Sequence, residues 1–144
     1  MARVSTYLNF ARSTEQAFEF YRSVFGGEFV GGIKRYGDMP PSPDHPMAEG
    51  DGNLVLHVEL PILGGFFLMG SDAPESMGHN VKAGNNVYIN LEPDSREEAD
   101  RLFQALSAGG AVEMPIQDMF WGAYFGSLID KFGTKWMVNH TPTP

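Results

Sequence analysis

The chain has 144 residues, of which 42% are hydrophobic and 12% aromatic, which is enough for one domain or for two small halves that share a core. Its net charge of −8 and the scattering of its ten basic residues argue against a nucleic-acid partner, because phosphate binding needs clustered positive charge. The sequence has no cysteine, which excludes disulfides, thiolate metal ligands and cysteine nucleophiles.

The sequence is expected to contain neither a membrane-spanning helix nor a secretory signal. No apolar run reaches the roughly 18 residues that a membrane-spanning helix needs. The N-terminal stretch MARVSTYLNF has no extended apolar segment that ends in a small-residue cleavage site. We therefore expect no membrane partner, and the absence of cysteine suits a cytoplasmic location.

The two halves of the sequence echo each other. YLNF at 7–10 is matched by YINL at 88–91, and a segment with helical periodicity follows each of them. These segments predict helices near 13–26 and 95–108, with Ser13 and Ser95 as N-caps and a glycine pair at each C-terminal end. In the first helix the apolar stripe is formed by Ala17, Phe20, Tyr21 and Val24.

Three strand-like runs follow each predicted helix, separated by glycine, proline and aspartate. They lie near 28–36, 54–62 and 66–70 in the first half and near 111–116, 123–130 and 135–140 in the second. Residues 37–53 form a proline-rich excursion between two of the strands. The pattern predicts an α+β fold, a single domain of two β-α-β-β-β modules at about 1–72 and 85–144, with a linker at about 73–84.

Several motifs carry a resemblance to a known family. They are STYLNF, AFEFYRSVFGGEF, HVELPI, LMGSDAPE and QDMFWGAYFGSLIDKFGTKWMVNH, and together they cover essentially the whole chain. In these motifs the chain resembles the vicinal oxygen chelate superfamily (glyoxalase I, extradiol dioxygenases, fosfomycin-resistance and bleomycin-binding proteins), and within it the PhnB-like branch. The resemblance implies a curled, eight-stranded mixed sheet around a shared cavity, commonly within a homodimer.

Some PhnB-like relatives carry a ubiquinone-pathway methyltransferase label. A typical methyl-donor site needs a glycine-rich turn from a strand into a helix. Here FGGEFVGG instead ends a helix and enters a strand. The sequence therefore does not support methyl transfer.

Metal-using members of the superfamily take histidine and glutamate ligands from the first and last strand of each module. The resemblance places those positions at Ser5 (or Thr6, with a shift of one residue), Met69, Asn86 and Met137. A serine, an amide and two thioethers do not form a site for a hard or borderline divalent ion. We therefore expect neither a metal site nor a cofactor.

The first strand of each half alternates apolar and polar residues. Leu8, Phe10, Ile89 and Leu91 are expected beneath the helices, whereas the other set is expected to line the cavity. That set consists of Tyr7, Asn9, Tyr88 and Asn90, joined by Asn86, Met69 and Met137. Phenols and amides would offer hydrogen bonds without fixed charge. The alternative is that some of them are merely solvated sheet-surface residues.

His57 and Glu59, in NLVLHVELPI, share one face if this run is a strand. Facing a cavity, they are candidate catalytic residues, because a carboxylate beside an imidazole suits general acid–base chemistry. A structural or interface pair and a displaced two-ligand metal site remain the alternatives. His45, His79 and His140 are interpreted as surface residues.

The segment PIQDMFWGAYFG combines polar groups with large apolar faces. Gln117, Asp118 and Trp121 are candidate pocket residues for a flat or aromatic ligand, and Phe120 and Trp121 are equally suited to a dimer contact. Asp130, just before KFG, is interpreted as a hairpin-turn residue.

Two functions remain in competition. The first is a metal-independent protein that binds an unidentified small molecule, similar to the bleomycin-binding branch. The second is a lyase or isomerase that uses His57 and Glu59 for proton transfer, or a non-standard metal. A structural or regulatory partner protein is a third, weaker reading.

Overall fold

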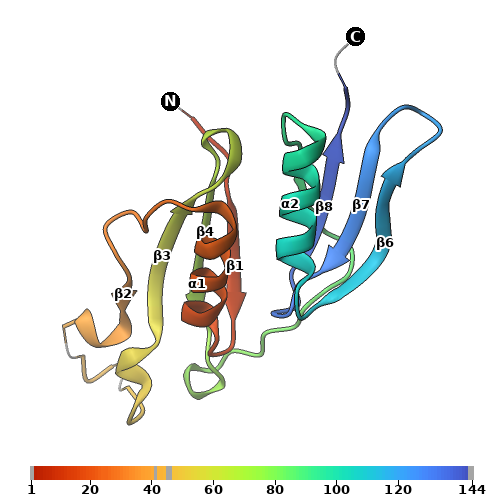
Figure 1. The fold of residues 1–144 in the computed structure, drawn as a ribbon. Helices are drawn as coiled ribbons and strands as arrows, with labels where there is room; N and C mark the ends of the chain where they lie inside the picture. The colour runs from red at the N-terminus through yellow and green to blue at the C-terminus, as the bar shows by residue number, and fades with distance from the viewer. Residues whose placement is uncertain (1, 41, 45–46, 143–144) are drawn as a thin grey trace. The chain divides into compact units, whose positions relative to one another are not determined.

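The computed structural model describes residues 2–40, 42–44 and 47–142, and it forms two compact units, one ending at Lys82 and the other beginning at Ala83. The division falls inside the predicted linker at 73–84. Each unit contains the predicted order β-α-β-β-β, and the α+β class is confirmed (Figure 1).

Unit 1 has four strands and one α-helix. They are β1 (Thr6–Phe10), α1 (Thr14–Phe25), β2 (Lys34–Arg35), β3 (Val55–Pro61) and β4 (Phe67–Asp72). The strand order is β1-β4-β3-β2; β1 runs parallel to β4, and the other pairs are antiparallel. Four short 3₁₀ helices occupy the connections: η1 (Tyr36–Asp38), η2 (Asp51–Asn53), η3 (Leu63–Gly65) and η4 (Glu75–Met77).

Unit 2 repeats this plan. Its elements are β5 (Ile89–Leu91), α2 (Arg96–Ser107), β6 (Ala111–Asp118), β7 (Tyr124–Ile129) and β8 (Lys135–His140). The strand order is β5-β8-β7-β6, again with the first and last strands parallel. The eight strands thus fall into two four-stranded mixed sheets, one in each unit, and a cavity shared by the two modules stays a prediction.

The two helices lie within one residue of their predicted bounds. In α1 the side chains at Ala17, Phe18, Tyr21 and Val24 are buried, which is the i, i+1, i+4, i+7 face of a helix. The sequence pattern placed Phe20 in the apolar stripe of this helix. In the structure Phe18 takes that place, and Phe20 is only half-buried. Each helix covers one face of the sheet in its own unit (Figure 1).

The strand predicted at 28–36 is wrong for most of its length. Only Lys34 and Arg35 are paired in a sheet. Gly31 and Gly32 have φ values of 71° and 73°, in the left-handed region that an extended strand does not use. The amide of Gly32 also donates to the carbonyl of Phe29, which closes a turn at this point.

The strands bury alternate residues against the helices. In β3 and β4 the residues on the helix side include Val58, Leu60, Leu68 and Gly70, and a Cβ added to Gly70 would lie 2.6 Å from the ring of Phe18. The intervening side chains lie on the opposite face, which no helix of the same unit covers; we call it the open face of that unit.

Among the described residues, no helix is long and apolar enough to span a membrane.

Candidate functional site

The open face of unit 1 brings together most of the polar residues that the sequence singled out in the first module. Tyr7 on β1 is the register partner of Met69 on β4, and Met69 is in turn the partner of Glu59 on β3. Asn9 lies two residues further along β1, beside Ser71, whose hydroxyl donates to the Asn9 amide oxygen at 3.1 Å. Alternation along adjacent strands therefore gathers these side chains on one surface.

His57 lies on β3, on the same open face, beside Lys34 of β2. Its Nδ1 is hydrogen-bonded to the phenol oxygen of Tyr7 at 3.2 Å, and the two rings stack with centroids 5.7 Å apart. Its Nε2 lies 4.0 Å from Oε1 of Glu59, beyond hydrogen-bond distance. The imidazole is thus oriented on one side by a phenol, while its other nitrogen is left beside a carboxylate.

Arg3 extends the cluster, and sequence reasoning missed it. A guanidinium nitrogen of Arg3 lies 3.6 Å from Glu59, and the guanidinium stacks 4.5 Å from the ring centroid of Phe67. The Glu59 side chain is 16% exposed and the Arg3 side chain 52% exposed. Because Arg3 precedes the first strand, no periodic pattern could have placed it.

Tyr36, in η1, is a second residue that sequence reasoning missed. Its hydroxyl donates to the carbonyl of Asp72 at the end of β4, at 2.7 Å. Burial raises the pKa of the Tyr36 phenol, and the nearby Asp72 carboxylate and Tyr7 side chain raise it further. Tyr36 therefore stays protonated beside the Asp72 end of β4. The sequence placed Tyr36 at the end of the strand predicted at 28–36, whereas the structure places it in η1.

Unit 2 presents a corresponding row on its own open face. Asn90, Met137, Ser127 and Met114 are successive register partners across β5, β8, β7 and β6. Met69 and Met137 thus occupy matching places in their sheets, each beside the first strand of its unit. Their partners differ, since the neighbour of Met69 is Tyr7 and that of Met137 is Asn90.

Tyr88 belongs to a charged cluster in unit 2. Glu113 accepts hydrogen bonds from the Tyr88 hydroxyl at 2.9 Å and from Nζ of Lys135 at 2.7 Å, and Nζ lies 4.8 Å from the Tyr88 ring centroid. The Lys135 ammonium lowers the pKa of Glu113, and Glu113 raises the pKa of Lys135. The two opposite charges compensate each other, so the pair offers no net charge to a ligand.

The two polar candidates on β6 lie on different faces. Gln117 pairs with Phe125, whereas Asp118 pairs with Tyr124, whose hydroxyl donates to Asp100 on α2. Asp118 accepts two hydrogen bonds from Arg96 at the start of α2, at 2.7 and 3.0 Å, and this guanidinium lowers its pKa. Asp118 thus holds β6 to the helix, away from the open face.

Asn86 and Trp121 lie outside the sheets. Asn86 is an exposed residue three positions ahead of β5. Trp121 is in the β6–β7 turn, 59% exposed, packed edge-to-face against Phe120 at 4.9 Å, and Phe120 is 97% exposed. The structure therefore does not bring either residue to the rows formed by the other candidates of unit 2.

The remaining histidines take different positions. His79 is exposed, and His45 lies outside the described residues. His140 is half-buried, and its Nδ1 donates to the carbonyl of Pro93 at 2.9 Å, which ties the end of β8 to the segment before α2. His140 therefore makes a structural contact, contrary to its interpretation as a surface residue.

The positions that the family resemblance assigns to metal ligands do not suit a divalent ion here. Ser5 precedes β1, Asn86 precedes β5, and the strand residues beside Met69 and Met137 are Tyr7 and Asn90. A set made of a hydroxyl, amides, a phenol and thioethers lacks the imidazole and carboxylate donors that nickel, zinc, iron or manganese prefer. Over residues 2–40, 42–44 and 47–142, no three histidine, aspartate or glutamate side chains come together as a metal site.

The sequence matches, over residues 2–139, the family described as 3-demethylubiquinone-9 3-methyltransferase. Protein YjdN of Escherichia coli strain K12 is 31% identical over 142 residues, covering 94% of this chain and 93% of that protein.

Solved structures agree with this assignment. Protein PA1353 of Pseudomonas aeruginosa is 34% identical, with a TM-score of 0.83 and coverage of 98% of each chain. A putative 3-demethylubiquinone-9 3-methyltransferase, PhnB protein, from Bacillus cereus is 28% identical, with a TM-score of 0.76 and coverage of 97% of this chain and 100% of that one.

A more distant structure extends the likeness of fold. A glyoxalase/bleomycin resistance protein/dioxygenase family enzyme from Burkholderia phytofirmans PsJN is 20% identical, with a TM-score of 0.64 and coverage of 95% of this chain and 98% of that one. The chain therefore belongs to the family described as 3-demethylubiquinone-9 3-methyltransferase, a PhnB-like branch with the vicinal oxygen chelate fold.

Proposed function

We propose that the chain binds a small organic molecule on the open face of unit 1, without a metal ion. One observation carries the proposal: Tyr7, His57, Glu59 and Met69 lie together on a sheet face that no helix of their unit covers. These side chains combine an aromatic surface, a polarizable thioether and hydrogen-bonding groups. Such a surface suits a flat, partly polar ligand.

The name of the family describes methyl transfer, but the local structure here supports that reaction poorly. The turn from β1 into α1 consists of Ala11, Arg12 and Ser13 and contains no glycine, whereas the glycine pairs at 26–27 and 31–32 follow α1. A nucleotide-like methyl donor is typically held by a glycine-rich turn ahead of a helix. We therefore propose binding in place of methyl transfer.

The binding proposal can be tested with a library of small planar phenols and aromatic amides, followed by ¹H–¹⁵N NMR. Binders are expected to shift the amide signals of Tyr7, His57, Glu59 and Met69. The substitution His57→Asn is expected to weaken the binding of these compounds by about 1–3 kcal/mol, or roughly 5- to 150-fold, as is typical when a hydrogen-bond partner is lost. His79→Asn, at an exposed histidine, is the matched control. Shifts confined to other residues would contradict the proposal.

The metal-free part of the proposal has its own test. A tightly bound ion would stabilise the folded state by mass action, so that a chelator would lower the thermal midpoint. We expect the midpoint to be unchanged by chelator, and elemental analysis to find no stoichiometric nickel, zinc, iron or manganese. About one such ion per chain would overturn this part of the proposal.

A second candidate function is proton-transfer catalysis by the same residues, as in a lyase or isomerase. The observation in its favour is that Tyr7 orients His57 through Nδ1 while Nε2 lies beside Glu59. A general base at this position would exchange acidic C–H protons of bound carbonyl compounds with D₂O, which ¹H NMR detects. His57→Asn would then reduce the exchange rate by about 10²- to 10⁴-fold. If the library compounds bind without exchange, simple binding is favoured.

We also propose that the chain forms a homodimer. Val87, Phe120 and Trp121 are 71%, 97% and 59% exposed, and large apolar side chains in that state favour a protein contact. Sedimentation at micromolar concentration is expected to give about twice the chain mass of 15.9 kDa. A monomer under these conditions would exclude the proposal, and loss of the dimer in Phe120→Ser/Trp121→Ser would locate the contact.

A further inference from the structure

Two 3₁₀ turns pack against each other beside the β2–β3 edge of unit 1. We call residues Lys34–Asp38 and Asp51–Leu54 together the clasp. A Cβ added to Gly37 would lie 3.0 Å from the carbonyl oxygen of Gly52, so the two turns meet backbone to backbone. The amide of Tyr36 also donates to the carbonyl of Leu54 at 3.0 Å. The two halves of the clasp therefore move as one piece.

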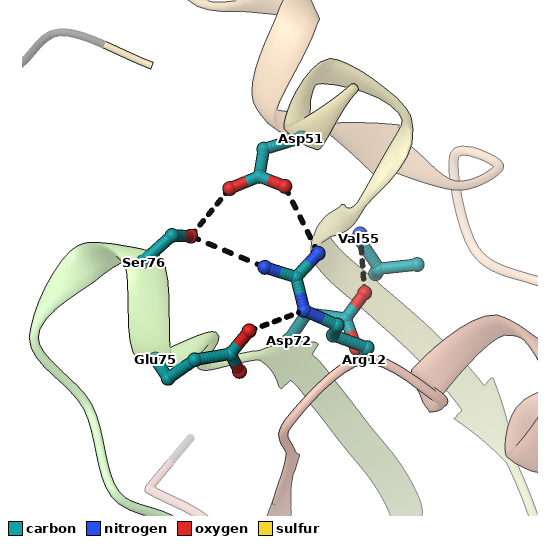
Figure 2. Close-up of polar contacts among 6 residues, drawn as sticks. All are labelled: Arg12, Asp51, Val55, Asp72, Glu75 and Ser76. Carbon is teal, nitrogen blue, oxygen red and sulfur yellow. Dashed lines mark hydrogen bonds and ion pairs between the residues drawn. The ribbon is translucent and has the colours of Figure 1, made fainter. Parts of the chain in front are cut away.

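Arg12 links the clasp to two other segments of the unit. Arg12, in the turn after β1, donates to Oδ1 of Asp51 at 3.0 Å and to Glu75 on η4 at 2.8 Å (Figure 2). The hydroxyl of Ser76 donates to Oδ2 of Asp51 and in turn accepts from Arg12 at 3.4 Å. The Asp51 side chain is only 4% exposed, so its charge depends on these two partners for compensation.

Polar contacts, not apolar packing, hold the clasp. Among the described residues, none of the hydrophobic side chains between Val24 and Val55 is buried. The other fastenings are also polar: Arg35 donates to Glu15 at 2.9 Å and to the carbonyl of Asn53 at 2.7 Å. A region with few buried apolar contacts opens at a lower free energy than the core around it. The clasp is thus suited to local opening.

The clasp borders the open face. Lys34 is the register partner of His57, and β2 consists of only two residues with an irregularity between them. Tyr36 crosses to the end of β4 and donates to the carbonyl of Asp72. Opening of the clasp would remove Lys34 from the side of His57 and Tyr36 from the end of β4.

We propose that the clasp opens as a unit when the Arg12–Asp51 pair breaks, and that this opening controls access to the His57 edge of the open face. Arg12 is then a positioning residue, because it acts on the site through Asp51. The proposal deepens the proposed function, and it rests on that function only in treating the open face as the binding site. The opening itself is measured without a ligand.

Hydrogen exchange followed by NMR tests the opening. In Arg12→Gln, the hydrogen-bonded amides of Tyr36, Met39 and Leu54 are expected to exchange about tenfold faster or more, given the loss of charge-assisted hydrogen bonds. The amides of β3 from Val58 to Leu60 are expected to be unchanged. Ser76→Ala, which removes one hydrogen bond, is expected to act in the same direction to a smaller extent.

Arg22→Gln is the matched control, because Arg22 also binds two carboxylates, Glu19 and Glu28, but lies on α1. It is expected to leave the exchange of the clasp amides unchanged. Uniformly faster exchange throughout unit 1 in both Arg12→Gln and Ser76→Ala would overturn the proposal, since Arg12 would then support the whole unit. Unchanged exchange in both variants would overturn it as well.

Chemical modification tests the access. Diethylpyrocarbonate reacts with neutral imidazole, and the His57 side chain is 35% exposed in the closed clasp. Its reaction rate is expected to rise in Arg12→Gln, while the rate of the exposed His79 stays the same. Faster amide exchange without faster His57 modification would refute the gating role. Neither readout needs a bound molecule, so a failed library screen would leave this result intact.

Discussion

Asp130 and Trp136 are joined by a hydrogen bond from the indole Nε1 to Oδ2 at 2.8 Å, and both side chains are buried. The other carboxylate oxygen of Asp130 accepts from the amides of Phe132 and Thr134, at 2.8 and 3.0 Å. One side chain thus closes the β7–β8 turn and anchors the largest buried residue of unit 2. The sequence predicted the turn role of Asp130 but not the contact with Trp136.

Asp130→Ala is expected to destabilise the protein by about 1–3 kcal/mol or more, because it leaves a buried indole N–H and two turn amides without their acceptor. Urea unfolding followed by tryptophan fluorescence measures the effect. Asp94→Ala, at an exposed aspartate, is the control and is expected to change little. An equal effect of the two substitutions would show that the buried hydrogen bonds of Asp130 contribute nothing.

The two serine N-caps, predicted alike, differ in the structure. Ser95 accepts from the amide of Glu98 at 3.1 Å, but the Ser13 side chain makes no capping hydrogen bond. In unit 1, Asp72 at the end of β4 accepts from the amide of Thr14 at 3.0 Å, and its other oxygen accepts from Val55. A residue from a neighbouring strand therefore replaces the local cap.

Ser95→Ala is expected to cost roughly 0.5–2 kcal/mol, the usual effect of losing a serine cap, and Ser13→Ala clearly less. Chemical denaturation of the two single variants, compared with the parent protein, provides the measurement. Each serine is the matched control for the other, because both precede a 12-residue helix. A larger loss for Ser13→Ala would contradict this assignment of the caps.

The fold was predictable because its main determinants are local. Apolar periodicity located both helices, and alternation along 7–10 correctly separated Tyr7 and Asn9 from the buried side of β1. The failure at 28–36 has a local cause too, since β-prone residues there are interrupted by glycines with positive φ. The strand propensity of the surrounding residues does not reveal that these glycines interrupt the strand.

The equivalence of the two modules was only partly predictable. Matching YLNF with YINL pairs Tyr7 with Tyr88, but sheet register places Tyr7 beside Met69 and Asn90 beside Met137. Met69 and Met137 are therefore equivalent in the structure, and Asn90 holds the place of Tyr7. A shift of two residues preserves the face, which is why Asn90, and not Tyr88, holds that place.

The candidate site was predicted where it depends on alternation and missed where it depends on tertiary contacts. His57, Glu59, Tyr7 and Met69 share a face because of strand periodicity and register. Arg3 reaches Glu59 from the segment before β1, and Tyr36 reaches the end of β4 from the short helix η1. Such contributions follow from how distant segments fold together, which no periodic pattern encodes.

Gly126→Ala is expected to destabilise unit 2 strongly. An added Cβ would lie 2.7 Å from the Phe103 ring and 2.8 Å from Cα of Ile116, and the second contact is with backbone that cannot turn away. Overpacking of this kind typically costs about 1–3 kcal/mol or more. Gly84→Ala is the control, because its Cβ would meet only the Asn86 side chain, at 3.6 Å. Urea midpoints that match for the two variants would show that β6 moves to make room.

The Glu113–Lys135 pair predicts a specific dependence of stability on pH. Lys135 lowers the pKa of Glu113 below its ordinary value of 4.5. A carboxylate whose pKa is lowered in the folded state stabilises the protein above its unfolded pKa, and the stabilisation is lost as pH falls through the folded pKa. Glu113→Gln is therefore expected to lower the urea midpoint near neutral pH. The difference from the parent protein is expected to shrink as the pH falls below about 4.5 and to vanish at lower pH, where Glu113 is protonated and resembles glutamine.

Urea unfolding at about pH 7, 5 and 3 measures this difference, with Glu49→Gln at an exposed glutamate as the control. A difference that persists undiminished at the lowest pH would mean that the Glu113 side chain acts through its shape and not through its charge. A difference in the urea midpoint that disappears at low pH in Glu113→Gln, with no such difference in Glu49→Gln, would instead assign the stabilisation to the contact with Lys135. That contact crosses the sheet from β6 to β8, so its loss is expected to weaken the end of unit 2 that carries Tyr88.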